Sequence, residues 1–179
     1  IKVYISEGKT SLDLTKSKSY VLPTVYEDDQ DLKNHLEAAN QYCLSSIHYT
    51  TPKGKEITLD GSETMNWLTK NDDGTYTKDE STFKSKLNEF VKSLASQYNS
   101  IGSSRTFTGQ DGQSHTVSGG TYGFRVSQDK EVSALFALMS ENKSEESRVP
   151  EHTGQLPSEG NGGLGSSYIE VNITKQHLW

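Results

Sequence analysis

The strongest pattern in the sequence is DESTFKSKLNEFVKSLASQYN, residues 79–99. Its apolar side chains recur every three or four residues, which places them on one face of a helix. They are Phe83, Leu87, Phe90, Val91, Leu94, Ala95 and Tyr98. The spacing predicts a helix from about Asp79 to Asn99, with this face buried and with Gly102 as its C-terminal stop.

Two further helices are expected on either side of this one. The earlier helix should start at an N-cap, Asp28 or Asp29, and its apolar face is Leu32, Leu36, Ala39 and Cys43. The later helix should start after Ser127, and its apolar face is Val132, Leu135, Phe136 and Met139. Three helices of this kind need a further layer to cover their apolar faces.

Short alternating segments between the helices predict that layer. Residues 47–49 and 57–59 should form a hairpin across a Pro-Lys-Gly turn, and residues 105–107 and 115–117 a second hairpin. Residues 1–26 also alternate as strands do. We therefore expect an α+β fold in which three helices pack on a mostly antiparallel sheet.

The composition changes after residue 140 and divides the chain. Residues 1–140 are expected to form the α+β domain, and residues 141–167, rich in Ser, Glu and Gly, a linker. Residues 168–173 predict a new strand, so that 168–179 would be the first strand of a truncated β-rich domain. Because the first residues already alternate, we expect the sequence to be part of a longer protein.

Charge and composition narrow the possible partners. The chain has 179 residues and a net charge of −6, and it shows no stripe rich in Lys and Arg. A phosphate backbone or an anionic lipid surface would be repelled, which argues against nucleic acid and direct membrane binding. Cys43 is the single cysteine, at a core position of its helix, and a buried, inert thiol is expected there.

Catalytic and metal-binding motifs are weak. Residues 69–80 match part of a calcium-binding loop, but Thr69 stands where the first carboxylate should be, which favours an ordinary Asp-Gly turn. Ser114 and His115 are neighbours in a predicted strand and so point to opposite faces. The five histidines lack the spacing of a zinc site. No metal, cofactor or catalytic residue is therefore expected.

Several segments together resemble one family. They are Leu59-Asp-Gly61 followed by Trp67-Leu68, the helix ending in Ser93–Asn99, then Arg105–Phe107, and Gly119–Phe124. In order and spacing this set is similar to the peptidoglycan-binding domain that precedes the catalytic domain of L,D-transpeptidases. Residues 165–179 resemble the opening strand of the catalytic domain itself, which is of the YkuD type.

The resemblance implies a role in cross-linking of the cell wall. The whole enzyme would form 3-3 crosslinks between stem peptides through a cysteine acyl-enzyme, outside the cell at the wall or the outer face of the membrane. The His segment and the Ser-x-Gly-Cys motif of that chemistry do not occur in this sequence, and Cys43 does not match them. We therefore expect a non-catalytic module, with the catalytic domain as its partner in cis.

A shallow surface is expected to contact peptidoglycan, either its stem peptides or its glycan. The candidate residues are Arg105, Gly119, Gly120, Tyr122 and Phe124, since glycines allow close approach and aromatic rings cover sugars or peptides. Phe124 departs from the family, in which Trp is expected. Two other functions stay open, a purely structural stalk and a hydrolase. The strand at 168–173 is also expected to mediate self-association through its open edges.

Overall fold

The computed structural model describes residues 6–8, 10–11 and 26–179. The strands expected within residues 1–26 lie almost entirely outside these ranges. The described helices are α2 (Gln30–Tyr42), α3 (Gly61–Thr64), α4 (Glu80–Tyr98) and α5 (Gln128–Ser140), with the 3-10 turns η1 (Met65–Trp67) and η2 (Asn161–Gly163). The strands are β1 (Ile47–Thr50), β2 (Glu56–Leu59), β3 (Thr69–Lys70), β4 (Tyr76–Thr77), β5 (Arg105–Thr108), β6 (Ser114–Val117), β7 (Phe124–Val126), β8 (His152–Gly154), β9 (Val171–Asn172) and β10 (His177–Leu178).

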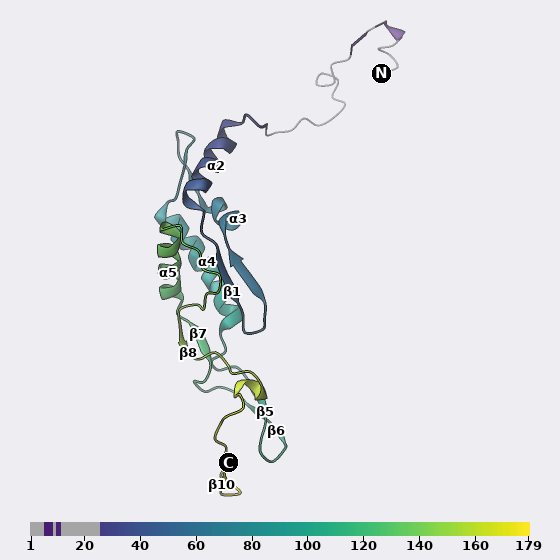
Figure 1. Cartoon of the computed structure of the whole chain (residues 1–179), viewed down its shortest axis with the longest axis vertical. Coiled ribbons are helices and arrows are strands. Elements are labelled where there is room, and N and C mark those ends of the chain that lie inside the picture. Colours follow the sequence, from purple (N-terminus) through teal and green to yellow (C-terminus); the bar gives the residue numbers. More distant parts are fainter. Residues whose placement is uncertain (1–5, 9, 12–25) are drawn as a thin grey trace.

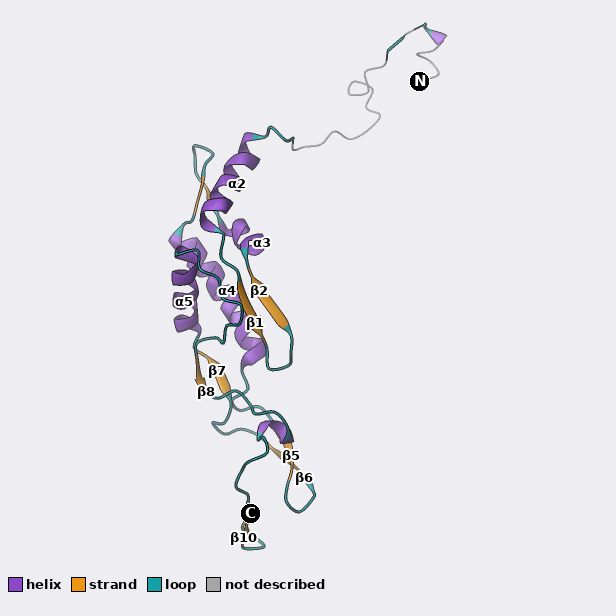
Figure 2. Cartoon of the chain, in the orientation of Figure 1, coloured by secondary structure: helices purple, strands orange, loops and turns teal. Residues whose placement is uncertain are grey.

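The α+β class is confirmed, but the strands are arranged differently from the expected sheet. In the described part of the chain they form five separate antiparallel pairs, and four of these are hairpins of neighbouring strands. The fifth joins β7 to β8 across α5, with Phe124 opposite Gly154. Residues 26–179 form an elongated body, with α2 near one end and β10 near the other (Figures 1 and 2).

Helix α4 organises the core as its periodicity predicts. Asp79 caps its N-terminus by accepting a hydrogen bond from the backbone N–H of Thr82. The helix lies between α5 and the β1–β2 hairpin (Figure 1). Of its predicted face, Phe90 is half-buried and the rest is buried: Phe83, Leu87, Val91, Leu94, Ala95 and Tyr98. Gly102 does not end the helix, which stops at Tyr98; Gly102 instead has a φ of +78° in the turn that follows.

The expected apolar face of α2 is wrong at two positions. Leu32 and Leu36 are 49% and 55% exposed, whereas Ala38 and Cys43 are buried. Asp29 is the N-cap, one of the two predicted residues. The helix touches the β4 and η1 region through His35, whose ring stacks on Tyr76 at 4.4 Å between ring centroids. Asp31 and Asn34 also contact the β3–β4 hairpin, through Lys70 and the Gly74 carbonyl, so the contact face of α2 lies to one side of the leucines, with His35 at the edge nearest Leu32.

Part of the segment expected as a linker from residue 141 contacts the preceding helices and strands. Glu145 pairs with Ile47 as an isolated parallel bridge, and residues 152–154 form β8 against β7. Arg148 bonds the buried Glu131 twice, from Nε to Oε1 at 2.8 Å and from Nη2 to Oε2 at 3.0 Å. Residues 145–154 are thus held against β1, β7 and α5 by ion pairs and backbone hydrogen bonds, which the low apolar content of the segment does not indicate.

Glu131 forms a buried polar centre that no sequence pattern predicts. Its carboxylate also accepts a hydrogen bond from the Tyr49 hydroxyl at 2.6 Å and one from the backbone N–H of Glu151 at 2.7 Å. Burial, and then the negative charge of Glu131, raise the pKa of Tyr49, so its hydroxyl keeps the proton that it donates. The carboxylate is thus fully hydrogen-bonded, as a buried charge must be.

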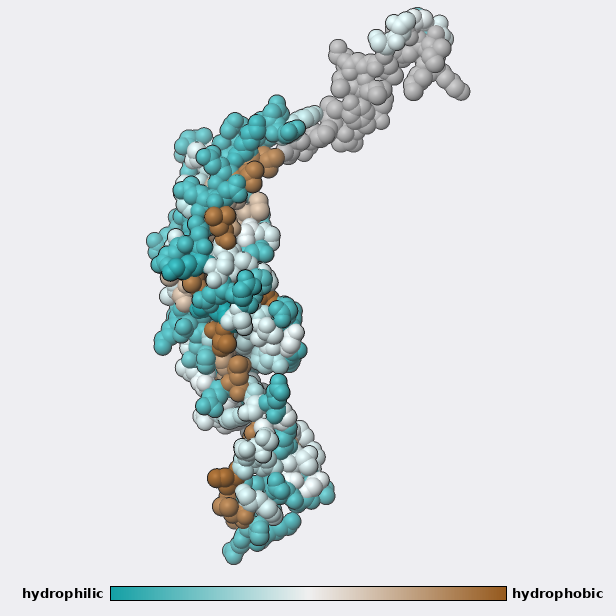
Figure 3. All heavy atoms as spheres, in the orientation of Figure 1, coloured by the Kyte–Doolittle hydropathy of each residue, from teal (hydrophilic) through white to brown (hydrophobic). Residues whose placement is uncertain are grey.

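The C-terminal strand is shorter than expected and is paired. Val171 and Asn172 of β9 pair with Leu178 and His177 of β10, so residues 171–178 form a small hairpin. Glu170 accepts a hydrogen bond from the backbone N–H of Gln110 at 2.9 Å, which ties this hairpin to the β5–β6 turn. Ile169 and Ile173 remain 77% and 86% exposed. Figure 3 shows brown apolar atoms at this end of the chain.

Candidate functional site

The predicted surface residues lie around the β5–β6 hairpin and the loop before β7. The Arg105 guanidinium lies over the Tyr122 ring, 4.8 Å from its centroid, and its Nη2 donates to the Ser100 carbonyl at 3.4 Å. The Tyr122 hydroxyl donates to the Gly163 carbonyl at 2.7 Å. These contacts fix a cation and an aromatic ring against each other while leaving Tyr122 42% exposed.

The two glycines beside this pair suit a contact surface. Gly119 and Gly120 have φ values of +76° and +77°, a conformation that side chains other than glycine rarely adopt. No atom lies within 4 Å of a Cβ built on either of them, so both face open space. The structure thus brings Arg105, Gly119, Gly120 and Tyr122 to one exposed region, which we call the Arg105 surface.

Phe124, the fifth predicted residue, does not belong to this surface. Its side chain is 0% exposed and packs between Tyr98 and His152, with ring centroids 5.7 and 4.4 Å away. Strand alternation explains the error, because Phe124 and Val126 point to the core while Arg125 points outward. A ring that is fully buried at this position is not available to stack on a sugar at the surface.

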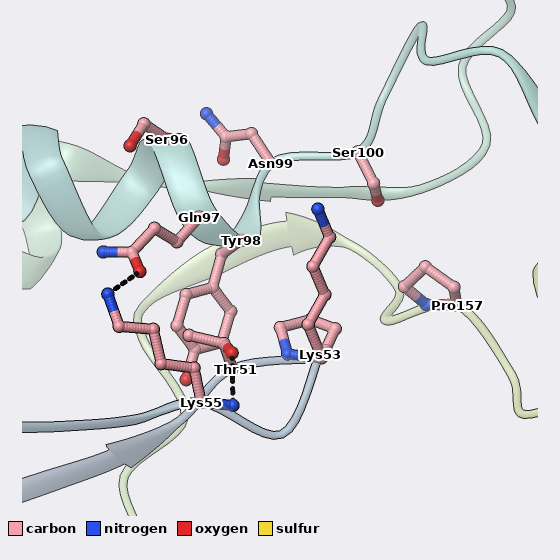
Figure 4. Close-up of a pocket in the computed structure, with 10 residues that line it drawn as sticks. Thr51, Lys53, Lys55, Ser96, Gln97, Tyr98, Asn99, Ser100 and Pro157 are labelled. Carbon is pink, nitrogen blue, oxygen red and sulfur yellow. Dashed lines mark hydrogen bonds between the residues drawn. The ribbon is translucent and has the colours of Figure 1, made fainter.

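A hollow of about 390 Å³ lies beside the Arg105 surface, at the C-terminal end of α4 (Figure 4). Thr51, Pro52, Lys53 and Lys55 of the β1–β2 turn form one side, residues 96–100 another, and Pro157 a third. Ser100 belongs to both places, since it lines the hollow and its carbonyl accepts from Arg105. Two lysines in a turn and a polar helix end form no recognisable sequence motif, so this hollow could not be predicted from the sequence.

The side chains considered for catalysis are Cys43, Ser114 and His115. Burial raises the pKa of the Cys43 thiol, which favours the protonated, unreactive form. His115 Nε2 lies 3.0 Å from Asp111 Oδ1, and its neighbour Ser114 points to the other face of β6. In the described ranges no group of three or more His, Cys, Asp or Glu is arranged to hold a metal ion.

One serine–histidine contact was not foreseen. Ser46 Oγ lies 3.0 Å from His48 Nε2, and His48 Nδ1 lies 3.1 Å from the Thr58 hydroxyl. Among the described residues no carboxylate is hydrogen-bonded to the His48 ring. A neutral hydroxyl cannot stabilise an imidazolium as an acid does, so the contact resembles a catalytic pair in one distance only. We interpret it as a link between the start of β1 and β2.

No protein-family model matches the chain, and no curated protein sequence does. Solved structures do. The Ldtfm–avibactam carbamoyl enzyme superposes with a TM-score of 0.53 and 26% identity, over 83% of this chain and 55% of that one. A cysteine-to-serine mutant of the Enterococcus faecium L,D-transpeptidase superposes with a TM-score of 0.50 and 25% identity, over 84% and 56%.

These matches relate the fold to the L,D-transpeptidases. The chain spans a little over half of the length of each matched structure, 55% and 56%. The relation therefore concerns part of those proteins.

In the described part of the chain no helix is long and apolar enough to cross a bilayer.

Proposed function

We propose that this chain is a non-catalytic module of a cell-wall L,D-transpeptidase, and that it binds or positions peptidoglycan for the catalytic domain. The observation that carries the proposal is the match of 83% of the chain to little more than half of an L,D-transpeptidase structure. A module of this kind would act outside the cell, next to a catalytic domain in the same polypeptide. The enzyme's acyl transfer would then occur in that domain.

The surface chemistry supports a binding role. In a chain with a net charge of −6, Arg105, Lys53 and Lys55 gather around the hollow and the Arg105 surface, and no Asp or Glu lines the hollow. Local positive charge suits a polymer whose peptides carry free carboxylates. Tyr122 adds an exposed ring that can cover a sugar or a peptide.

A stalk is the second candidate, and its supporting observation is the elongated shape, with α2 and β10 near opposite ends (Figure 1). As a stalk the chain would hold the catalytic domain at a set distance from its anchor without binding the wall polymer. The two functions differ in a single measurable property, affinity for peptidoglycan.

A pull-down with purified sacculi separates them. We expect the wild-type chain to sediment with sacculi, and Arg105→Gln to sediment less. Arg125→Gln is the matched control, because Arg125 is an exposed arginine on β7 outside the Arg105 surface. Absence of the wild-type chain from the pellet would reject the binding role and leave the stalk.

A further inference from the structure

In the hollow at the end of α4, several hydrogen-bond donors have no partner in the described structure, whereas the side-chain acceptors already have one. Lys53 extends from the β1–β2 turn toward Asn99 and Ser100, and Lys55 toward Gln97 (Figure 4). Figure 4 also shows Pro157 closing one side. The ligand that the hollow can bind depends on which of these groups already have hydrogen-bond partners within the fold.

The acceptors of the hollow already hold donors. Gln97 Oε1 accepts from Lys55 Nζ at 3.0 Å, and Asn99 Oδ1 accepts from the backbone N–H of Val126 at 2.8 Å. Thr51 Oγ1 accepts from the backbone N–H of Lys55 at 3.0 Å. These donors also fix which way both amide groups point, since each needs an oxygen opposite it.

The donors, in contrast, are largely unused. Lys53 Nζ makes no hydrogen bond or ion pair within the described ranges, and Lys55 Nζ makes one of the three that an ammonium can make. With their oxygens turned to Lys55 and Val126, Gln97 and Asn99 leave their NH₂ groups without a partner in the described structure. The hollow thus offers two cations and two neutral amide donors.

We propose that this hollow binds the free C-terminal carboxylate of a short peptide with small side chains. The ammonium groups of Lys53 and Lys55 would pair with the carboxylate, and the amide NH₂ groups of Gln97 and Asn99 with a neighbouring peptide carbonyl. The rings of Pro52 and Pro157 supply an apolar wall for methyl groups. The proposal deepens the proposed function, because peptidoglycan stem peptides end in such a carboxylate.

The mixture of donors favours a peptide over a phosphate polymer. A phosphate group is commonly held by Arg forks or by clustered backbone N–H groups, and neither lines this hollow in the described structure. Here two of the four donor groups are neutral amides, which match carbonyl oxygens. Pro157, which lines the hollow, also lies close to Gly163 and Arg105: a Cβ on Gly163 would lie 3.0 Å from Pro157 Cβ and 2.6 Å from Arg105 Nη1.

Backbone amide shifts in NMR titrations of the full chain test the proposal. The probe is N-acetyl-alanyl-alanine, compared with the same dipeptide ending in a carboxamide and with inorganic phosphate. We expect the carboxylate probe to shift residues 53–55 and 96–100, and the carboxamide to bind at least several-fold more weakly. Equal binding of the carboxamide, or tighter binding of phosphate than of the dipeptide, would overturn the proposal.

Lysine variants assign the charge to the hollow. Lys53→Ala should weaken binding on the order of threefold, as expected for an exposed ion pair, and Lys53→Ala with Lys55→Ala further. Lys130→Ala is the control, since it removes an exposed lysine of α5 that does not line the hollow. Lys53 Nζ has no partner to lose among the described residues, so its variant should keep the spectrum of the folded chain. Unchanged affinity in the double variant would reject the site.

The two proposals fail in different ways. If sacculi retain the wild-type chain but the dipeptide shifts no residue of the hollow, the peptide site is wrong and the binding module stands. If the dipeptide binds in the hollow but sacculi do not retain the chain, the carboxylate site stands and its assignment to peptidoglycan is wrong.

Discussion

Arg148 and Glu131 lie 17 residues apart in the chain and meet through two parallel hydrogen bonds inside the fold. Their side chains are 10% and 0% exposed. The pair joins the segment after α5 to the helix itself, and the Tyr49 hydroxyl connects β1 to the same carboxylate. Three parts of the chain are therefore held by one buried acid.

Loss of Arg148 should destabilise the domain strongly. Arg148→Met leaves the Glu131 carboxylate buried without its cation, for which we expect a cost of about 3–5 kcal/mol in the free energy of unfolding. Denaturant unfolding measures this, with Arg125→Met as the exposed control. The double variant Arg148→Met, Glu131→Gln should recover part of the loss. A single variant within about 1 kcal/mol of wild type would mean that the pair is dispensable.

Truncation of the α4 core should distinguish it from the exposed face of α2. Leu87→Ala removes a side chain that is 0% exposed, and we expect a loss of about 2–5 kcal/mol. Leu32→Ala, at a position 49% exposed, should cost about 0.5 kcal/mol or less. Urea unfolding of both variants tests the assignment. Equal losses would show that Leu32 is covered in solution.

The cap of α4 should give a specific pH dependence. Hydrogen bonds from the Thr82 side chain and backbone, and then from Ser81, lower the pKa of Asp79 to about 2. Because the folded pKa is depressed, the ionised cap stabilises the fold above the unfolded pKa near 3.8, and this contribution is lost as pH falls from there toward 2. The stability difference between wild type and Asp79→Ala should be constant above pH ~5 and shrink below pH ~4. A difference that does not change with pH would exclude the charged cap.

The C-terminal hairpin should promote self-association. Ile169 and Ile173 are 77% and 86% exposed, and β9 has a free edge because its described partner is β10 alone. We expect the chain to associate in sedimentation at high concentration, and removal of residues 168–179 to return it to monomer. Ile169→Lys with Ile173→Lys should do the same without shortening the chain. A monomer in every case would refute pairing through this segment.

Periodicity alone predicted much of the architecture. The α4 bounds and both long hairpins follow from local alternation and helical spacing, which depend on neighbours in the sequence. Phe124 and the Leu32 face were misplaced because their environment depends on which element lies opposite. The burial of Glu131 could not be predicted for the same reason, because it requires the segment after α5 to place Arg148 beside it.

The site was predictable only in part. Glycines with positive φ and a Tyr near an Arg are visible in the sequence, and the structure brings Arg105, Gly119, Gly120 and Tyr122 together. The hollow beside them could not be predicted. Its lysines come from the β1–β2 turn, its amides from the end of α4, and one of its walls from Pro157. Only the tertiary fold determines that the oxygens of Gln97 and Asn99 accept hydrogen bonds while their NH₂ groups have no described partner.

The separation of the strands into pairs has a consequence for cooperativity. In the described chain no member of the hydrophobic core cluster lies within residues 105–117 or 158–179. The β5–β6 hairpin, η2 and the last hairpin are instead held to one another by contacts such as Asn161 to Thr108 and Glu170 to Gln110. Amide protons there should exchange with solvent through a local opening that leaves α4 and α5 protected. Tyr122 and Gly163 would then separate, so the Arg105 surface would open and close while the body of the domain stays folded.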